Sequence, residues 1–212
     1  MNGLAKIKQL GLMSFFLAMF ERLRNTLLQR RFGFDLWHIS GTYHARPYKA
    51  LAVGLVNDLK PKCVLDVGGG LGDIISRVQA KQRILADASA EVLAASVALH
   101  GDSVVYVKAN FAQLPEALAA LPLDRIDVLI MINWPHNLDF AEIHQGLAAI
   151  KEKLPIRYLL TDLMYWQTEQ GFHRHSASQY QQVGEVLKLI DGQDGARNLL
   201  LSNSHFDRDH LK

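Results

Sequence analysis

Five short apolar runs alternate with helical patterns along most of this 212-residue chain. Turn residues bound each run, and a continuous short apolar run is typical of a strand that is buried on both faces of a parallel sheet. The runs cover residues 63–67, 83–87, 103–109, 126–132 and 157–162. Because strands and helices alternate, the pattern predicts a doubly wound α/β sheet with right-handed crossovers.

Two of the intervening segments carry clear helix signals. The segment SAEVLAASVALH begins with Ser89, a residue type that caps helix N-termini, and ends before Gly101. The segment 138–154 has apolar residues at helical spacing and ends before Pro155. Both predictions place a helix between consecutive strands of the sheet.

The alternation changes after the fifth strand. Residues 181–190 and 196–203 flank the stretch DGQDG, and its Asp194-Gly195 pair favours a tight reversal of the chain. We therefore expect a mostly parallel seven-stranded sheet with a C-terminal antiparallel hairpin. The expected division is a helical, basic and apolar extension over residues 1–45 and one main domain over residues 46–212.

The turn after the first strand is rich in glycine. It lies in CVLDVGGGLGDII, residues 63–75, at the carboxyl edge where open α/β sheets bind ligands, and we expect the next helix to begin near Leu71. A dinucleotide fingerprint needs glycines at the first, third and sixth positions, and no register of this turn provides them. No Gly-Lys-Ser/Thr follows either, which excludes a phosphate-binding P-loop.

The spacing acid-x-Gly-x-Gly-x-Gly, formed by Asp66, Gly68, Gly70 and Gly72, resembles the S-adenosylmethionine-dependent methyltransferases of the Rossmann-like class (class I). The resemblance covers roughly residues 46–203. It implies the Rossmann-like methyltransferase fold, methyltransferase activity and S-adenosylmethionine as the cofactor. It also implies that the glycines let the backbone approach the ribose and the amino acid tail, and that Asp66 faces the ammonium group.

The same resemblance suggests further cofactor-binding residues. Asp87 closes the second strand 21 residues after Asp66 and matches the acid that the family uses for the ribose hydroxyls, with Ala88 next to it. Asn110, followed by Phe111, stands where the family commonly has an Asp that accepts from the adenine amino group. An amide oxygen can accept as well, so Asn110 is retained as a cofactor residue.

The methyl acceptor is expected near the end of the fourth strand, in INWPHN, residues 132–137. Asn133 is assigned to the cofactor and Trp134 to the acceptor. The stretch only partly resembles the Asp/Asn-Pro-Pro-aromatic motif of enzymes that methylate amino groups of nucleic-acid bases, so base methylation is not inferred. His136 is interpreted as a general base for a hydroxyl acceptor, or alternatively as part of a cap, with Asn137, before the next helix.

The segment HISGTYHARPYK, residues 38–49, precedes the helix that leads into the first strand. It offers aromatic faces and a guanidinium fork, from Tyr43, His44, Arg46 and Tyr48, that suit a sugar or an anionic group in the acceptor. Tyr43 and Arg46 are assigned to the acceptor. The alternative is a surface loop in which Arg46 forms a local ion pair.

His173, in the polar and aromatic loop after the fifth strand, is assigned to the acceptor site. Asp162, at the end of that strand, is expected to support the pocket or to bind a substrate hydroxyl. His173 and His175 have a spacing that can serve a metal ion on a strand. No further acid or cysteine nearby completes such a site, so no metal is predicted.

Residues 1–31 carry six lysines and arginines against Glu21 alone, a net charge of +5, which leaves −3 for the rest of the chain. Within them, residues 9–20 are uncharged, too short a stretch to span a membrane, and ERLRN follows where a signal peptide would have its cleavage site. The segment is expected either to pack on its own domain or on a second subunit, or to lie in a membrane interface with arginines near anionic head groups. The acidic remainder argues against nucleic acid as a partner.

Cys63 is the single cysteine, so no internal disulfide can form, and a reducing compartment is expected. The stretches FGFDLWHISGTYHARPYK and VGEVLKLIDGQDGARNLLL look like bacterial methyltransferases of cell-surface glycan biosynthesis. We therefore expect a cytoplasmic enzyme, at the inner face of the membrane, that methylates an oxygen or nitrogen of a small-molecule or glycan acceptor. The alternative is a catalytically silent methyltransferase-like scaffold that docks through its N-terminal helix.

Overall fold

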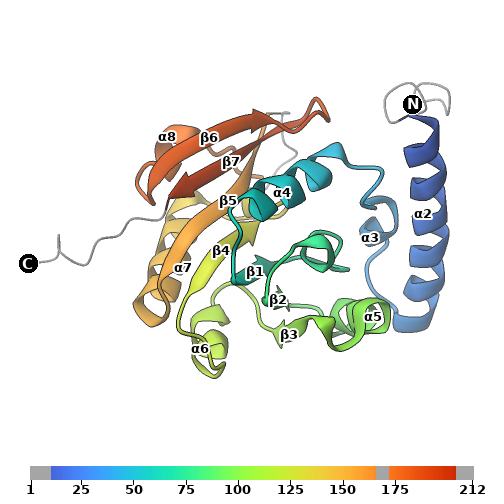
Figure 1. Ribbon diagram of the computed structural model, residues 1–212, viewed down its shortest axis with the longest axis horizontal. Coiled ribbons are helices and arrows are strands. Elements are labelled where there is room, and N and C mark those ends of the chain that lie inside the picture. Colours follow the sequence, from blue (N-terminus) through green and yellow to red (C-terminus); the bar gives the residue numbers. More distant parts are fainter. Residues whose placement is uncertain (1–10, 166–171, 204–212) are drawn as a thin grey trace, which may run out of the picture.

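The computed structural model describes residues 11–165 and 172–203, which form a seven-stranded sheet with helices on both faces (Figure 1). The strand order is β3-β2-β1-β4-β5-β7-β6. The strands are β1 Cys63–Val67, β2 Gln82–Asp87, β3 Val105–Lys108, β4 Ile126–Met131, β5 Ile156–Met164, β6 Glu185–Asp191 and β7 Arg197–Asn203. The first five are parallel, and β7 runs antiparallel between β5 and β6, which confirms the predicted fold.

The helices divide between the two faces. Their bounds are α2 Leu12–Phe32, α3 Trp37–Ser40, α4 Pro47–Asp58, α5 Ala90–His100, α6 Leu114–Ala119, α7 Phe140–Lys153 and α8 Ala177–Tyr180, with short 3-10 turns η1 Ile75–Arg77, η2 Gly101–Ser103 and η3 Pro135–Asn137. Apolar residues of α6, α7 and α8 form one core with the sheet, and those of α4, η1 and α5 form the other. The structure is thus a three-layer arrangement in which the sheet is the middle layer.

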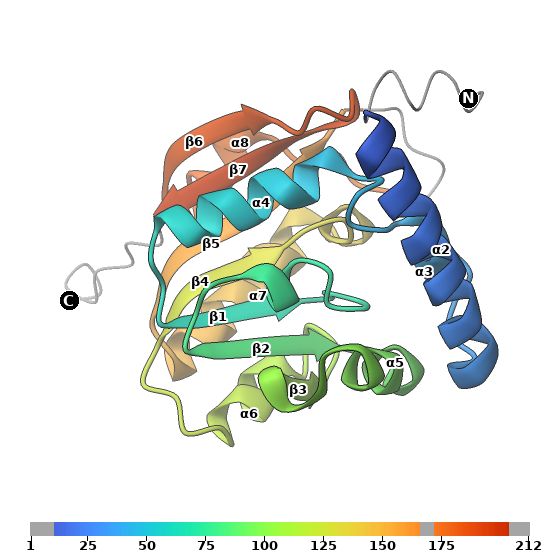
Figure 2. The same cartoon turned by 45° about the vertical axis from the view of Figure 1, so that its right-hand side comes forward.

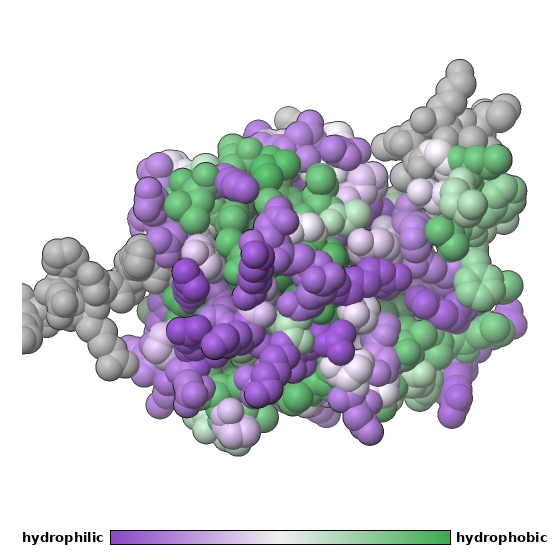
Figure 3. Space-filling view, viewed as in Figure 1, coloured by the Kyte–Doolittle hydropathy of each residue, from purple (hydrophilic) through white to green (hydrophobic). Residues whose placement is uncertain are grey.

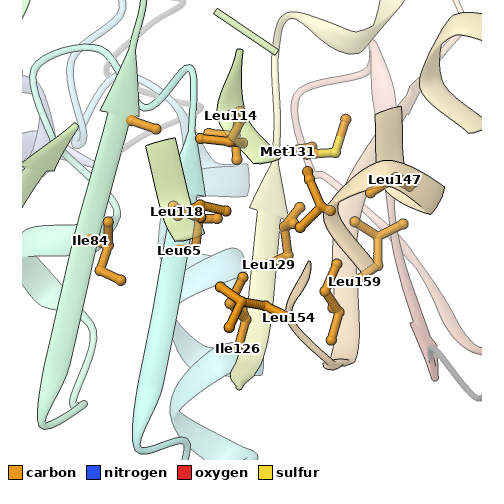
Figure 4. Packing of buried hydrophobic residues seen from close by; sticks show 14 of the residues in the cluster. Leu65, Ile84, Leu114, Leu118, Ile126, Leu129, Met131, Leu147, Leu154 and Leu159 are labelled. Carbon is orange, nitrogen blue, oxygen red and sulfur yellow. The ribbon is translucent and has the colours of Figure 1, made fainter. Parts of the chain in front are cut away.

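The central strands are buried on both faces. In β1, Leu65 belongs to the core under α7 and Val64 to the core under α4, and every residue of β1 and β4 is buried. Figure 4 shows Leu65, Leu129 and Leu147 in the first of these cores. Burying each such side chain contributes about 1.5–3 kcal/mol, so the apolar runs stabilise the sheet from both sides.

The helix ends follow from their capping residues. The Ser89 side chain accepts from the backbone N–H of Val92, as predicted for the N-cap of α5. The next long helix begins at Phe140 rather than at 138, because Asp139 and Glu142 form a capping box there.

The expected helix near Leu71 was wrong. Only residues 73–81 lie between Gly72 and β2, and they form turns and the single 3-10 turn η1. A segment this short leaves no room for a crossover helix of several turns, so η1 and α4 cover this part of the sheet instead.

The C-terminal reversal is tied by Asp194. Its Oδ1 atom accepts from the backbone N–H groups of Ala196 and Arg197, at 3.0 and 3.2 Å, and Gly195 takes the left-handed conformation with φ of +68°. This turn returns the chain into β7, so that β7 lies against β5 and ends the parallel part of the sheet.

Helix α2 stands beyond the carboxyl ends of β1 and β2, beside α3 and against α5 (Figure 2). The side chains that it buries are polar, namely Glu21 and Asn25. Among the described residues, no helix has both the length and the apolar character needed to cross a bilayer.

Candidate functional site

A cavity of about 470 Å³ opens at the carboxyl edge of the sheet, between the ends of β1, β2, β3 and β4 and the chain around α3 and the start of α4. This volume lies within the range of pockets that hold a small ligand or cofactor. Ten residues predicted for the site line it: Arg46, Asp66, Gly68, Gly70, Asp87, Ala88, Asn110, Phe111, Asn133 and Trp134. Tyr43, Gly72, His136, Asp162 and His173 do not.

Asp66 is the last residue but one of β1, and its carboxyl group is buried in the cavity wall. The residue is 3% exposed, and its Oδ2 atom has no hydrogen-bond partner among the described residues. Burial raises the pKa of this carboxyl from 3.8 to about 7, and the nearby Lys49 ammonium opposes the rise. A buried acceptor without a partner is costly, and a cationic ligand would relieve that cost.

Asp87 connects the two turns that form the cavity floor. Its Oδ2 atom accepts from the backbone N–H of Gly70 at 3.1 Å, and its Oδ1 atom accepts from the backbone N–H of Ser89 at 3.0 Å. A carboxylate has about four lone-pair sites, so Asp87 can still accept from a ligand hydroxyl.

Gly68 makes room for Trp134. A Cβ atom at Gly68 would lie 2.5 Å from Cδ1 of Trp134, and the indole N–H donates to the backbone oxygen of Val67 at 2.5 Å. Gly68 and Gly70 both have positive φ, and a Cβ atom at Gly70 would lie 3.1 Å from the His38 ring. The bare backbone predicted to receive the cofactor is therefore also needed for contacts within the protein.

Gly72 was predicted to bind the cofactor, but it faces the protein interior on the other side of the turn. A Cβ atom there would lie 3.0 Å from Oγ of Ser96 and 3.2 Å from the His100 ring, both on α5. Its φ of +78° turns the chain toward η1. The third glycine of the motif is thus required for the turn and for packing of α5, not for the cavity wall.

The adenine end of the predicted site comes from the loop after β3. The Asn110 Oδ1 atom accepts from the backbone N–H of Gln113 at 2.9 Å, so the amide oxygen predicted to face adenine already holds the start of α6 and has one lone pair left. Phe111 packs closely over Gly146 and lies 5.3 Å from the Trp134 ring. Phe111 and Trp134 together form an aromatic wall.

Asn133 is held by a buried polar network. The Asp162 Oδ1 atom accepts from the backbone N–H of Asn133 at 3.0 Å, and the Arg197 guanidinium donates to Asn133 Oδ1 at 3.0 Å. Asn133 has φ of +74°, a conformation that asparagine tolerates better than most residues. Asp162 was predicted to support the pocket or to bind a substrate hydroxyl. It is 3% exposed and lies behind Asn133, so it positions a lining residue and does not itself line the cavity.

His136 lies beside the cavity rather than in its lining. Its ring packs edge-on against Phe172 at 4.9 Å, and its Nδ1 atom is buried without a hydrogen-bond partner among the described residues. Burial, followed by the charges of Arg197 and His175, lowers the pKa of His136 to about 4. The ring is therefore neutral at pH 7, as a general base must be, but it is a weak base that the structure keeps from the cavity lining.

His173 and Tyr43 also lie away from the cavity lining. The backbone N–H of His173 donates to the backbone oxygen of His136 at 2.6 Å, which ties the loop after β5 to η3. The Arg77 guanidinium covers the Tyr43 ring at 3.9 Å. Both residues support segments that border the site. Among the described residues, no three metal-ligating side chains converge.

The lining residues that the sequence did not assign to the site include Lys49, Asp73 and His38. Lys49 pairs with Asp73 at 2.7 Å and also donates to the backbone oxygen of Gly41, and His38 reaches the cavity from α3. Lys49 and His38 are the two ends of the segment 38–49, and Asp73 directly follows Gly72. In the sequence these three polar residues stand in or next to segments already predicted for the site. Nothing in their spacing shows that they come together at the cavity.

No family model and no curated protein matches the sequence, whereas solved structures match the fold. The N-methyltransferase NodS from Bradyrhizobium japonicum, in complex with S-adenosylhomocysteine, has 11% identity and a TM-score of 0.65 over 85% of this chain and 97% of that chain. Magnesium protoporphyrin IX methyltransferase (ChlM) from Synechocystis, with bound S-adenosylmethionine, has 11% identity and a TM-score of 0.55 over 90% of this chain and 96% of that chain. An S-adenosylmethionine-dependent methyltransferase from Clostridium acetobutylicum has 9% identity and a TM-score of 0.54 over 74% of this chain and 90% of that chain.

These similarities cover nearly all of each solved chain and most of this one. They confirm that the chain has the Rossmann-like fold of the class I methyltransferases. At identities this low they establish the fold alone, and the function depends on the cavity.

Proposed function

We propose that this chain is an S-adenosylmethionine-dependent methyltransferase whose cofactor binds in the cavity at the carboxyl edge of the sheet. The observation that carries the proposal is Asp66, whose buried and unpartnered Oδ2 atom lies at the glycine turn of a methyltransferase fold. A carboxyl group in that position suits the ammonium group of an amino acid tail. The solved structures with the same fold include proteins described with S-adenosylmethionine or S-adenosylhomocysteine bound.

The remaining cavity residues fit the other parts of this cofactor. Asp87 retains free lone pairs for ribose hydroxyls, while Phe111 and Asn110 supply an aromatic face and an amide for adenine. Arg46 has no side-chain hydrogen bond or ion pair among the described residues, so its guanidinium is available for a carboxylate or another anionic group.

S-adenosylmethionine, when bound, supplies a methyl group activated by a positive sulfur. The protein then mainly has to align the acceptor with that methyl group and exclude water. Trp134 and Phe111 provide an apolar wall for this purpose, and Asn133 is held rigidly by Arg197 and Asp162. Proton removal from a hydroxyl acceptor suits His38 better than His136, because His38 lines the cavity.

The acceptor is proposed to be a small molecule or a glycan, methylated at oxygen or nitrogen. The room in the cavity supports a small acceptor, and Arg46 and His38 in its lining support one with hydroxyl or anionic groups. The solved structures with this fold include an N-methyltransferase and an O-methyltransferase, so the fold itself does not choose between the two atoms.

A catalytically silent scaffold remains the second candidate, and Trp134 is the observation that favours it. Its indole lies over Gly68, beside the turn that would have to receive the cofactor. A scaffold would keep the indole in this position and would bind neither S-adenosylmethionine nor S-adenosylhomocysteine.

Calorimetric titration with S-adenosylmethionine and S-adenosylhomocysteine distinguishes the enzyme from the scaffold. The wild type should bind both compounds. Asp87→Ala should weaken the affinity for each roughly tenfold or more, since it removes a charged hydrogen-bond acceptor. Asp102→Ala is the matched control, because Asp102 is an exposed acid in η2 outside the cavity. No binding to the folded wild type would reject the enzyme and favour the scaffold.

A further inference from the structure

Helix α2 presents an apolar face to solvent. Seven of its large apolar side chains are more than half exposed: Leu12, Met13, Phe16, Met19, Phe20, Leu23 and Leu27. With 3.6 residues per turn, these side chains lie on one side of the helix over four turns. Figure 3 shows hydrophobic surface along the right-hand edge of the molecule, where α2 lies. Contiguous exposed apolar surface of this kind marks an interaction site.

The orientation of α2 is fixed by contacts of its polar side. The Glu21 carboxylate accepts from His44, at 3.1 Å from the backbone N–H and 2.8 Å from Nδ1, and pairs with Arg77 at 3.4 Å. The Asn25 side chain donates to the backbone oxygen of His38 at 3.2 Å. Rotating α2 to bury its apolar side would expose these groups and break the contacts. The apolar face therefore remains available to a partner.

The charges around this face are basic. Helix α2 contains four arginines and one glutamate, and that glutamate is the buried Glu21. Helical spacing places Arg22 and Arg24 at opposite edges of the apolar face and puts Arg30 and Arg31 at its C-terminal end. An apolar strip bordered by arginines, with no exposed acid on the helix, is complementary to an anionic surface.

A second copy of the chain fits this face less well. Arg22 lies at the middle of α2, so a symmetric antiparallel contact between two such helices would bring Arg22 and Arg24 of both copies together. The exposed part of α2 offers no acid to pair with them, and like charges at an interface are unfavourable. An anionic bilayer accepts both the apolar side chains and the arginines.

The apolar surface continues to the rim of the cavity. Leu36 and Trp37 come four and five residues after the end of α2, beyond the exposed Asp35, and are 69% and 53% exposed. Trp37 and His38 also line the cavity. Figure 2 shows α2 and α3 together beyond the carboxyl ends of β1 and β2. Trp is the residue type that membrane interfaces favour most clearly, together with Tyr.

We propose that α2, together with Leu36 and Trp37, docks the protein on the surface of an anionic membrane and brings the rim of the cavity to that surface. The docking follows from α2 alone. A consequence, which rests on the proposed methyltransferase function, is that the acceptor is an amphiphile that reaches the cavity from the lipid surface.

The test is flotation of the full chain with vesicles of phosphatidylglycerol and phosphatidylcholine, compared with vesicles of phosphatidylcholine alone. We expect binding to the anionic vesicles that falls as salt is raised. The triple substitution Phe16→Ser, Phe20→Ser and Leu23→Ser should lower the partition coefficient roughly tenfold or more, since it removes the inserted side chains. The double substitution Arg30→Gln and Arg31→Gln should lower it by a similar factor on anionic vesicles only.

Matched controls separate docking from general loss of apolar surface or charge. Val97→Ser with Leu187→Ser and Leu189→Ser removes exposed apolar side chains outside α2, and Arg125→Gln with Arg157→Gln removes exposed arginines outside it. Both control variants should bind vesicles as the wild type does. Circular dichroism of each variant establishes that it is folded.

Three results would overturn the proposal: no vesicle binding by the wild type, binding unchanged by the α2 variants, or a dimer in light scattering that the triple substitution disrupts while vesicles are not bound. S-adenosylmethionine titration without vesicles is measured on the same samples. Cofactor binding without vesicle binding would reject docking alone, and vesicle binding without cofactor binding would reject the methyltransferase alone.

Discussion

The Arg197 guanidinium on β7 donates to the Asp162 carboxylate on β5 at 2.6 Å, and both side chains are only 1% exposed. The same guanidinium lies 4.0 Å over the Tyr48 ring and reaches Asn133 at the cavity. A buried pair contributes little net stability when intact, but removing one partner leaves the other charge buried and uncompensated. Because Arg197 on β7 contacts both Asp162 and Asn133, it connects the antiparallel end of the sheet to the wall of the cavity.

Arg197→Met should lower the free energy of unfolding by about 3–5 kcal/mol, because it leaves the Asp162 carboxylate buried without its partner. Urea unfolding at pH 7 measures the change. Arg125→Met is the control, since Arg125 is 52% exposed and pairs with Asp127 at 2.9 Å, and it should cost no more than about 1 kcal/mol. Equal losses in the two variants would contradict the special role of the buried pair.

Gly68→Ala should destabilise the protein more than Gly101→Ala does. Both glycines have positive φ, +64° and +56°, so each substitution incurs backbone strain of about 1–2 kcal/mol. Only at Gly68 does the new methyl group meet another atom, the Trp134 ring at 2.5 Å, whereas Gly101 has nothing within 4 Å. Overpacking should add about 1–3 kcal/mol at Gly68 and change the fluorescence of Trp134. Similar unfolding midpoints for the two variants would show that Trp134 moves away freely.

His136→Gln should reduce the loss of stability in acid. The folded-state pKa of His136 is about 4, below its ordinary value of 6.5, so the unfolded chain takes up the proton first as the pH falls. This group therefore destabilises the fold increasingly from pH 6.5 down to 4. Above pH 7 the free energy of unfolding should change with pH in the same way for the wild type and the variant. Below pH 7 it should fall more steeply for the wild type. An NMR titration that placed the pKa of His136 near 6.5 would contradict the prediction.

The class of the sheet, with its parallel strands and antiparallel end, could be predicted because the signal was local, whereas the strand order β3-β2-β1-β4-β5-β7-β6 comes from the structure alone. Mainly apolar runs such as 63–67 and 126–132, each with a single aspartate, are typical of strands covered on both faces, and the Asp194-Gly195 reversal indicated the antiparallel end. The helix expected near Leu71 was wrong because the strand-helix alternation does not register how little chain, residues 73–81, lies between Gly72 and β2.

The candidate site was predicted where it follows from strand ends, and missed where it depends on packing. Asp66 and Asp87 end parallel strands, so their arrival at one edge follows from topology. Whether Gly72 faces the cavity or α5 depends on which side of the turn α5 packs, and the sequence does not give that. For α2 the sequence left two orientations open, packing on the protein or lying in a membrane interface, and only the structure shows that its apolar side chains face outward.

Asp66 makes stability depend on pH in an identifiable direction. Burial raises its folded-state pKa to about 7 from 3.8, so the folded protein holds a proton that the unfolded chain has already lost between those values. Stability should therefore fall as the pH rises from 4 to 7 and stay low above 7, by at most on the order of 4 kcal/mol. Asp66→Asn removes the titration, so it should be more stable than the wild type at pH 8 and no more stable at pH 4.

The same carboxyl group should make cofactor binding depend on pH in the opposite direction. Only the ionised form attracts an ammonium group, so S-adenosylmethionine must displace the proton below pH 7, and its affinity should fall roughly tenfold per pH unit there. Calorimetry at pH 6 in buffers of different ionisation enthalpy should show close to one proton released for each molecule bound. Asp66→Asn should bind more weakly and without this dependence. Equal wild-type affinity at pH 6 and pH 8 would show that Asp66 does not face the ammonium group.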